Sequence, residues 1–124
     1  MPTFNRIDMV VLYVRDWPAM LAWYTSTFGP FGLETAFVEP EHRFAVLSLP
    51  GGGPVIHLVG DTTRQSAGRN RCVANISVSD FSAVVSAVGA LSGVEVVDLQ
   101  DDPEDGYRLL CIADPEGNEI NLYS

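Results

Sequence analysis

The 124-residue chain carries 16 acidic residues against seven arginines and no lysine, for a formal net charge of −9. This length suits a single domain with a real core, the acidity argues against a nucleic-acid partner, and the missing lysine excludes Schiff-base chemistry through a lysine side chain. Its apolar runs fall short of the roughly 18–20 residues of a membrane span, and its first residues lack a signal-peptide layout, so we expect a cytoplasmic protein with no membrane partner.

The first half of the chain predicts a strand, a helix and three more strands. Residues 7–14 are typical of a strand, and Asp16 suits the N-cap of the helix that follows. Gly29 suits the C′ position at the end of this helix. The apolar positions of the helix follow helical spacing at Trp17, Met20, Leu21, Tyr24 and Phe28. The further strands are expected near residues 33–38, 43–49 and 54–59.

The second half repeats this order. Residues 72–78 predict a strand, Asp80 the next N-cap, and Gly93 the end of the second helix. The apolar face of that helix is expected at Phe81, Val84, Val85, Val88 and Leu91. Strands are predicted near 94–99, 107–113 and 118–123. The acidic segment 98–105 lacks the spacing of a calcium loop and is interpreted as a solvated loop between strands.

An internal duplication organises the whole chain. The identical residues that a shift of 64 residues superposes include Val14 and Val78, Asp16 and Asp80, Gly29 and Gly93, Gly53 and Gly117, Ile56 and Ile120, and Leu58 and Leu122. We therefore predict one α+β domain, residues 1–124, made of two βαβββ modules at 5–60 and 71–124 with a linker at 61–70. A four-stranded sheet covered by one helix buries one face only, so the two sheets are expected to curve around a central cavity.

Two segments resemble the vicinal oxygen chelate superfamily, which includes glyoxalase I, extradiol dioxygenases and the fosfomycin and bleomycin resistance proteins. The opening of the chain, Ile7 to Asp16 with Trp23-Tyr24 and Phe28-Gly29, is similar to the start of that fold. Asp114-Pro115-Glu116-Gly117-Asn118 is similar to its terminal turn, and the residue types independently predict a tight hairpin. Members are commonly homodimers, so the resemblance also implies a homodimer.

The resemblance places metal ligands at four positions of this chain: Met9, His57, Val73 and Asn121. Only His57 is a good ligand, and a divalent ion needs at least three donors of the imidazole, carboxylate or thiolate type. Asp8 and Glu119 neighbour these positions, but strand alternation is expected to turn them to the opposite face. We therefore expect no metal or other cofactor. Cys72 and Cys111 lack metal spacing and are interpreted as packed thiols.

The remaining candidates would line a small-molecule pocket. Strand parity adds Val11 and Tyr13 to Met9, and Asn75 to Val73, while Phe37 and Phe44 are candidates for stacking on a planar ligand. His57 has three interpretations: a pocket-wall residue that hydrogen-bonds a ligand, a general base with Arg71 or Arg108 as helpers, or a packed interior histidine. His42 falls in a predicted turn. The run Gly51 to Gly53 predicts a hairpin loop and not a phosphate loop, because a phosphate loop needs a lysine that this sequence lacks.

The favoured function is a metal-independent binding protein, resembling the bleomycin resistance branch, that sequesters an aromatic or cationic compound between the modules. The charge of −9 and the poor set of metal ligands agree with this hypothesis. A metal-dependent glyoxalase-like lyase or isomerase, or an extradiol dioxygenase, is the alternative implied by the same resemblance. Two further alternatives are a metal-free enzyme that uses His57 as a base and a degenerate module with an interaction role. The sequence alone therefore leaves open whether the protein is an enzyme.

Overall fold

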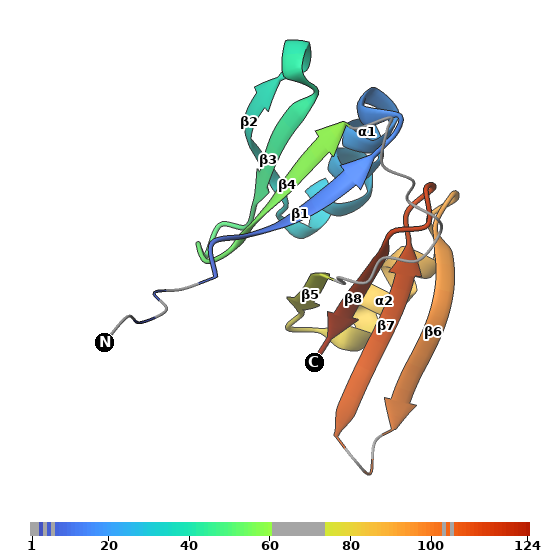
Figure 1. The fold of residues 1–124 in the computed structure, drawn as a ribbon. Coiled ribbons are helices and arrows are strands. Elements are labelled where there is room, and N and C mark those ends of the chain that lie inside the picture. The colour runs from blue at the N-terminus through green and yellow to red at the C-terminus, as the bar shows by residue number, and fades with distance from the viewer. Residues whose placement is uncertain (1–2, 4, 6, 61–73, 103, 105) are drawn as a thin grey trace. The chain divides into compact units, whose positions relative to one another are not determined.

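The computed structural model describes residues 3, 5, 7–60, 74–102, 104 and 106–124. The chain forms two compact units, Met1–Arg64 and Gln65–Ser124, and the described part of each contains one α-helix and one four-stranded mixed sheet (Figure 1). This confirms the predicted α+β fold of two βαβββ modules. The predicted linker, 61–70, lies outside the described residues. No helix in the described part of the chain is both long and apolar enough to cross a membrane.

The first unit follows the predicted order of elements. These are β1 (Met9–Val14), α1 (Trp17–Phe28), the short 3-10 helix η1 (Gly29–Phe31), β2 (Glu34–Glu39), the 3-10 helix η2 (Pro40–His42), β3 (Phe44–Ser48) and β4 (Val55–Gly60). The strands lie in the order β1-β4-β3-β2, with β1 parallel to β4 and the other neighbours antiparallel. Helix α1 covers one face of this sheet (Figure 1).

The core of the first unit lies between α1 and the sheet face that α1 covers. Asp16 caps the helix as predicted, since its Oδ1 accepts a hydrogen bond from the Ala19 backbone N–H at 3.2 Å. The indole of Trp17 donates to the Leu58 carbonyl oxygen at 3.1 Å and so fixes the helix to β4. Trp17, Tyr24 and Phe28 are buried, as the helical spacing predicts. Trp23 is half-buried and its ring packs edge-on against those of Tyr24 and Phe28.

Helix α1 ends at Phe28 as predicted, but the predicted C′ role of Gly29 and the predicted end of the second helix at Gly93 are wrong. Gly29 has a φ of −53° and continues into η1, and Gly32, with a φ of +99°, takes the left-handed position instead. Pro30 explains the extension, because its fixed φ suits the first turn of a helix. In the second unit α2 (Phe81–Gly89) ends before Gly93, and Leu91 lies exposed outside it. A glycine at the last helical position favours this early end.

The second unit repeats the topology with β5 (Ala74–Ser77), α2, β6 (Glu95–Asp102), β7 (Tyr107–Ala113) and β8 (Glu119–Tyr123). Its strand order is β5-β8-β7-β6, again with a parallel first pair. Asp80 caps α2 by accepting from the Ala83 N–H at 3.1 Å, as predicted. Its larger buried side chains include Phe81, Val88, Leu110, Ile112, Ile120 and Leu122.

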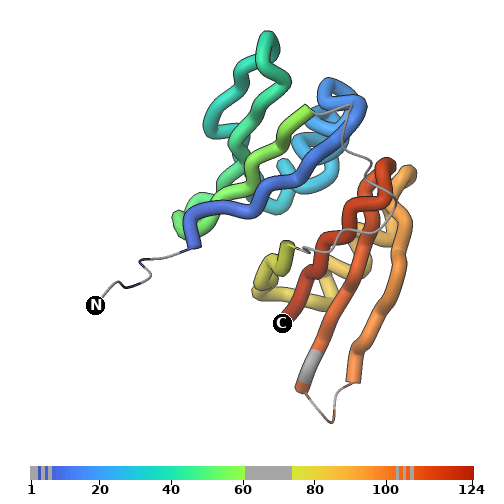
Figure 2. The backbone as a smooth tube through the Cα atoms, in the orientation of Figure 1, coloured from blue at the N-terminus to red at the C-terminus, as the bar shows by residue number. Residues whose placement is uncertain are grey.

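Strand β6 corrects the interpretation of the acidic segment. It pairs with β7 from Glu95 to Asp102, so the acidic residues up to Asp102 belong to a strand (Figure 2). All of its residues are exposed, and it lies at the edge of the sheet. Acidic side chains are compatible with an edge strand, where they oppose pairing with other chains. Pairing with β7 therefore overrides the low strand propensity of aspartate.

The turn at Asp114–Gly117 forms as predicted. Asp114 is 3% exposed, and its Oδ1 accepts hydrogen bonds from the backbone N–H groups of Glu116 and Asn118, both at 2.9 Å. Its Oδ2 accepts from the Asn118 side-chain amide at 2.8 Å. Gly117 has a φ of +86°, which a side chain would strain. The corresponding loop of the first unit contains Gly52 and Gly53 at positive φ, in agreement with the predicted hairpin.

Candidate functional site

One face of the first sheet turns away from α1 and carries the predicted ligand-binding residues of that unit. Leu12 and Val14 are buried on the α1 side, so alternation along β1 places Met9, Val11 and Tyr13 on the opposite face. Pairing across the four strands then aligns one row: Val11, His57, Val46 and Phe37. We call this surface, with Phe44, the helix-free face of the first sheet.

An aromatic cluster lies on this face, toward β2 and the start of β3. The rings of Phe44 and His57 meet edge to face, with centroids 5.0 Å apart and an interplanar angle of 89°. The Phe37 ring lies 6.1 Å from that of Phe44 and is 51% exposed. These distances lie in the range at which aromatic rings attract one another. The structure therefore brings together three of the predicted residues, contributed by β2, β3 and β4.

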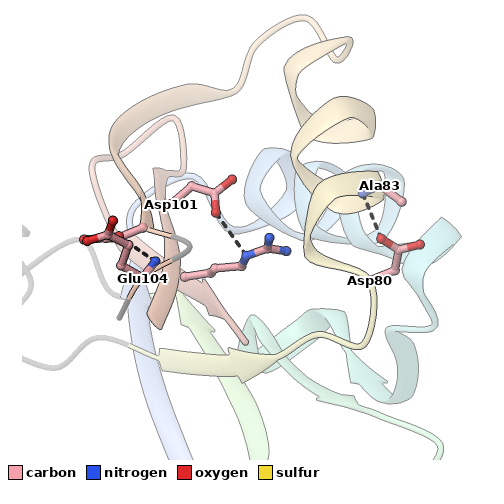
Figure 3. Close-up of polar contacts among 6 residues, drawn as sticks. Asp80, Ala83, Asp101 and Glu104 are labelled. Atoms are coloured by element: carbon pink, nitrogen blue, oxygen red, sulfur yellow. Dashed lines mark hydrogen bonds and ion pairs between the residues drawn. The ribbon is translucent and has the colours of Figure 1, made fainter. Parts of the chain in front are cut away.

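His57 is half-buried, and its described contact is with an aromatic ring. Among the described residues no carboxylate is hydrogen-bonded to it, whereas a general base needs a partner that orients the ring. The suggested helper Arg108 is engaged elsewhere. Its Nε lies 3.0 Å from Asp101 Oδ1, an ion pair drawn as a dashed line in Figure 3. Its guanidinium lies 5.8 Å from the centre of the Phe81 ring, and Phe81 belongs to α2. Arg71 lies outside the described residues.

The family's metal positions hold a poor set of donors. Met9, at the start of β1, is 42% exposed and offers a thioether, His57 an imidazole and Asn121 a carboxamide. Val73 lies outside the described residues and has no donor atom. Within the described ranges no group of three or more His, Cys, Asp or Glu side chains is arranged to hold a metal ion. The residues present therefore do not fit a catalytic divalent ion, which needs at least three good donors.

His42 lies on the surface, as predicted for a turn. Its Nδ1 is 2.7 Å from Glu39 Oε1, and both side chains are largely exposed. The contact joins residues three apart on η2 and its cap. His42 and Glu39 therefore form a local pair on the surface.

The second sheet has an equivalent face with a different chemistry. Pairing aligns a second row across it, made of Asn75, Asn121, Cys111 and Asp98. The Asn121 Nδ2 donates to Asn75 Oδ1 at 2.9 Å. We call this surface, with Glu119, the helix-free face of the second sheet.

Glu119 was expected on the opposite face, and this expectation is wrong. It lies two residues before Asn121 on β8, so strand alternation puts both side chains on the same face. Asp98 pairs with Cys111 across β6 and β7, and burial and then the charges of Glu119 and Asp98 raise the pKa of the Cys111 thiol. Cys111 is a free, buried thiol, as predicted, while Cys72 lies outside the described residues. Counting strand parity from Asn121 would have identified Glu119 from the sequence.

Comparison with known proteins agrees with this architecture. A family model described as the Glyoxalase/Bleomycin resistance protein/Dioxygenase superfamily matches residues 6–122. No curated protein matches the chain in sequence. Among solved structures, a glyoxalase / bleomycin resistance protein from Catenulispora acidiphila DSM 44928 is 27% identical, with 96% of this chain and 97% of that chain covered and a TM-score of 0.71.

Two further structures share the fold at lower identity. TnmS3, an antibiotic binding protein from Streptomyces sp. CB03234, is 20% identical over 98% of this chain and 97% of its own, with a TM-score of 0.75. A lactoylglutathione lyase from Agrobacterium tumefaciens is also 20% identical, over 98% of this chain and 94% of its own, with a TM-score of 0.74. The same fold thus occurs in a binding protein and in an enzyme.

Proposed function

Because the chain belongs to the Glyoxalase/Bleomycin resistance protein/Dioxygenase superfamily, and because its residues at the metal positions do not fit a divalent ion, we propose that it is a metal-independent binding protein for a small organic molecule. The ligand is a planar aromatic compound held against the helix-free face of the first sheet. The aromatic cluster of Phe37, Phe44 and His57 is the observation that carries this proposal.

Three properties of this face support an aromatic ligand. Phe37 offers an exposed ring, and Phe44 is held in place from both sides by its contacts with Phe37 and His57. Val11 and Val46 extend the apolar surface along the same row. A face with a large apolar area and one polar group is typical of small-molecule sites.

The antibiotic binding protein TnmS3 shares the fold, and the net charge of −9 favours a ligand that also carries positive charge.

The test is a titration of the full chain with a panel of planar aromatic compounds, neutral and cationic, followed by tryptophan fluorescence and calorimetry. For a compound that binds, Phe44→Ala should weaken affinity about three- to tenfold, since an aromatic pair contributes about 0.5–1.5 kcal/mol beyond its buried area. Phe37→Ala should act in the same direction. Phe31→Ala is the matched control, because Phe31 is also exposed, at 41%, but lies in η1. Equal affinities for Phe44→Ala and Phe31→Ala would refute the proposed site.

A metal-dependent lyase is the second candidate, because the lactoylglutathione lyase shares the fold over nearly the whole chain. Elemental analysis of the tag-free protein, before and after incubation with zinc, iron, manganese and nickel, separates the two. The binding protein should retain well below one metal per chain, while a near-stoichiometric ion would establish the lyase candidate. His57→Ala should leave a low metal content unchanged. We also propose a homodimer, which light scattering tests directly.

A further inference from the structure

Strand β6 forms an open edge of the second sheet. It runs for eight residues, against six in β2 at the equivalent place of the first sheet, and among the described strands it pairs with β7 alone (Figure 1). Alternate residues of an edge strand point their N–H and C=O groups away from the sheet, where another strand can bind them. At roughly 3.3 Å a residue, the second unit presents an open edge about 26 Å long.

Two apolar side chains of this edge are only half covered. Val96 and Leu99 pair with Ile112 and Leu110 of β7, so they share the face on which those two residues are buried. Val96 nevertheless stays 49% exposed and Leu99 47% exposed. A long edge strand with exposed apolar side chains favours the addition of another strand, and protection of the edge alone does not call for such surface.

The opposite face of β6 is acidic. Glu95, Asp98 and Asp102 pair with alternate residues of β7, so their side chains share this face. Among the described residues none of these three carboxylates is in an ion pair. Arg108, the one arginine in the described part of this unit, is already paired with Asp101 at 3.0 Å. The edge therefore combines an apolar row on one face with uncompensated negative charge on the other.

These charges decide which strand fits the edge. Two copies of β6 paired antiparallel about the middle of the strand would place Glu95 opposite Asp102, and like charges at directly opposite positions are destabilising. Strand β2 of a second copy would bring acids at both of its ends, Glu34 and Glu39. The acidic face thus opposes a second copy of this chain and favours a strand with basic side chains.

We propose that the edge of β6 is a docking site for a basic segment of another protein, which adds to the four-stranded second sheet as a further strand. The segment alternates apolar residues, which pack on Val96 and Leu99, with lysine or arginine, which face Glu95, Asp98 and Asp102. Backbone hydrogen bonds supply the affinity in this mode of recognition, and the alternating side chains supply the specificity. The site goes beyond the proposed function, because it uses the edge of the second unit and no residue of the aromatic cluster.

The probe is a peptide of alternating lysine and valine with the eight-residue length of β6, titrated into the full chain. Nuclear magnetic resonance should show saturable shifts concentrated on the backbone amides of β6, and hydrogen exchange of its outward amides should slow in the complex. The same peptide with proline at a central valine should bind about two- to tenfold more weakly, because proline cannot donate a hydrogen bond to the added strand. A peptide of alternating glutamate and valine should cause no saturable shifts.

Two variants test the two faces of the edge separately. Glu95→Gln should weaken binding of the lysine–valine peptide about two- to fivefold, because an exposed ion pair is lost. Glu34→Gln, which removes one exposed charge from β2 of the first unit, is its matched control. Leu99→Ala should weaken binding about three- to tenfold through the lost apolar contact, and Leu49→Ala, at a leucine 38% exposed in the first unit, is its control. If Leu99→Ala fails to fold, Glu95→Gln and its control still decide.

Four results would overturn the proposal. They are wild-type affinity in both Glu95→Gln and Leu99→Ala, equal binding of the lysine and glutamate peptides, saturable shifts confined to elements other than β6, and no saturable shifts at all. Protection of the β6 amides that rises with protein concentration in the free chain would overturn it as well, because a second copy would then occupy the edge. Loss of aromatic binding in Phe44→Ala has no bearing on these results, so the two sites fail separately.

Discussion

Replacement of Asp114 by alanine is expected to destabilise the protein by about 3–5 kcal/mol. The carboxylate is 3% exposed and accepts three hydrogen bonds, from two backbone N–H groups and from the Asn118 side chain. A hydrogen bond to a charged group contributes about 1.5–3 kcal/mol, and the three are not additive because the turn can relax toward water. The result is a large part of the roughly 5–15 kcal/mol that stabilises a typical domain.

Urea unfolding followed by far-ultraviolet circular dichroism measures this change. Asp114→Asn should lose less, about 1–2 kcal/mol, because one oxygen remains while the new amide group faces the Asn118 amide donor. Asp102→Ala is the control, since Asp102 is exposed and its carboxylate accepts one bond, from the Glu104 N–H at 2.9 Å (Figure 3). It should change stability by less than about 1 kcal/mol. A loss at Asp114→Ala no larger than at Asp102→Ala would refute the role of the buried carboxylate.

Three further predictions concern the backbone and the thiol. Gly60→Ala should destabilise the protein by about 1–3 kcal/mol, because a β carbon there would lie 2.7 Å from that of Arg43; thermal unfolding checks this. Gly29→Ala should instead stabilise it by about 0.4–1 kcal/mol, because Gly29 has a helical φ of −53° and open space around it. A loss of stability in Gly29→Ala would instead support a left-handed C′ conformation at Gly29. Burial and two nearby carboxylates raise the pKa of the Cys111 thiol, so its contribution to stability is present below the unfolded pKa and is lost as pH rises through the folded one. Cys111→Ala should therefore lose less stability than wild type between neutral and alkaline pH in parallel urea titrations.

Local rules in the sequence were sufficient for the N-caps, the hairpin turn and the order of elements. Asp16 and Asp80 cap their helices through bonds to residues three positions ahead, and the Asp114 turn closes within five residues. The 64-residue repeat then extended one module to the whole fold. The sequence analysis also named Phe44 and His57 as candidates for one pocket, although their ring contact required the register between β3 and β4.

One detail of the repeat appears only in the strand register. His57 pairs with Val46, whereas Asn121 pairs with Cys111, so β3 and β7 are related by 65 positions and not 64. The hairpin between β3 and β4 is therefore one residue longer than its counterpart between β7 and β8. An ungapped shift of the sequence passes over this difference, and it would have paired His57 with the wrong neighbour.

The sequence by itself determined the capped helix starts and the family motifs, because each depends on residues close together in the chain. It also determined the duplicated βαβββ order, because the same local signals recur 64 residues later. Tertiary structure decided that the acidic residues of β6 form a strand, and that Cys111 and Asp98 lie in one row with the Asn75–Asn121 pair. Both outcomes depend on pairing between strands. Hydrogen bonds across a sheet outweigh the weak preference of an aspartate for other local conformations, and they bring distant side chains into one row.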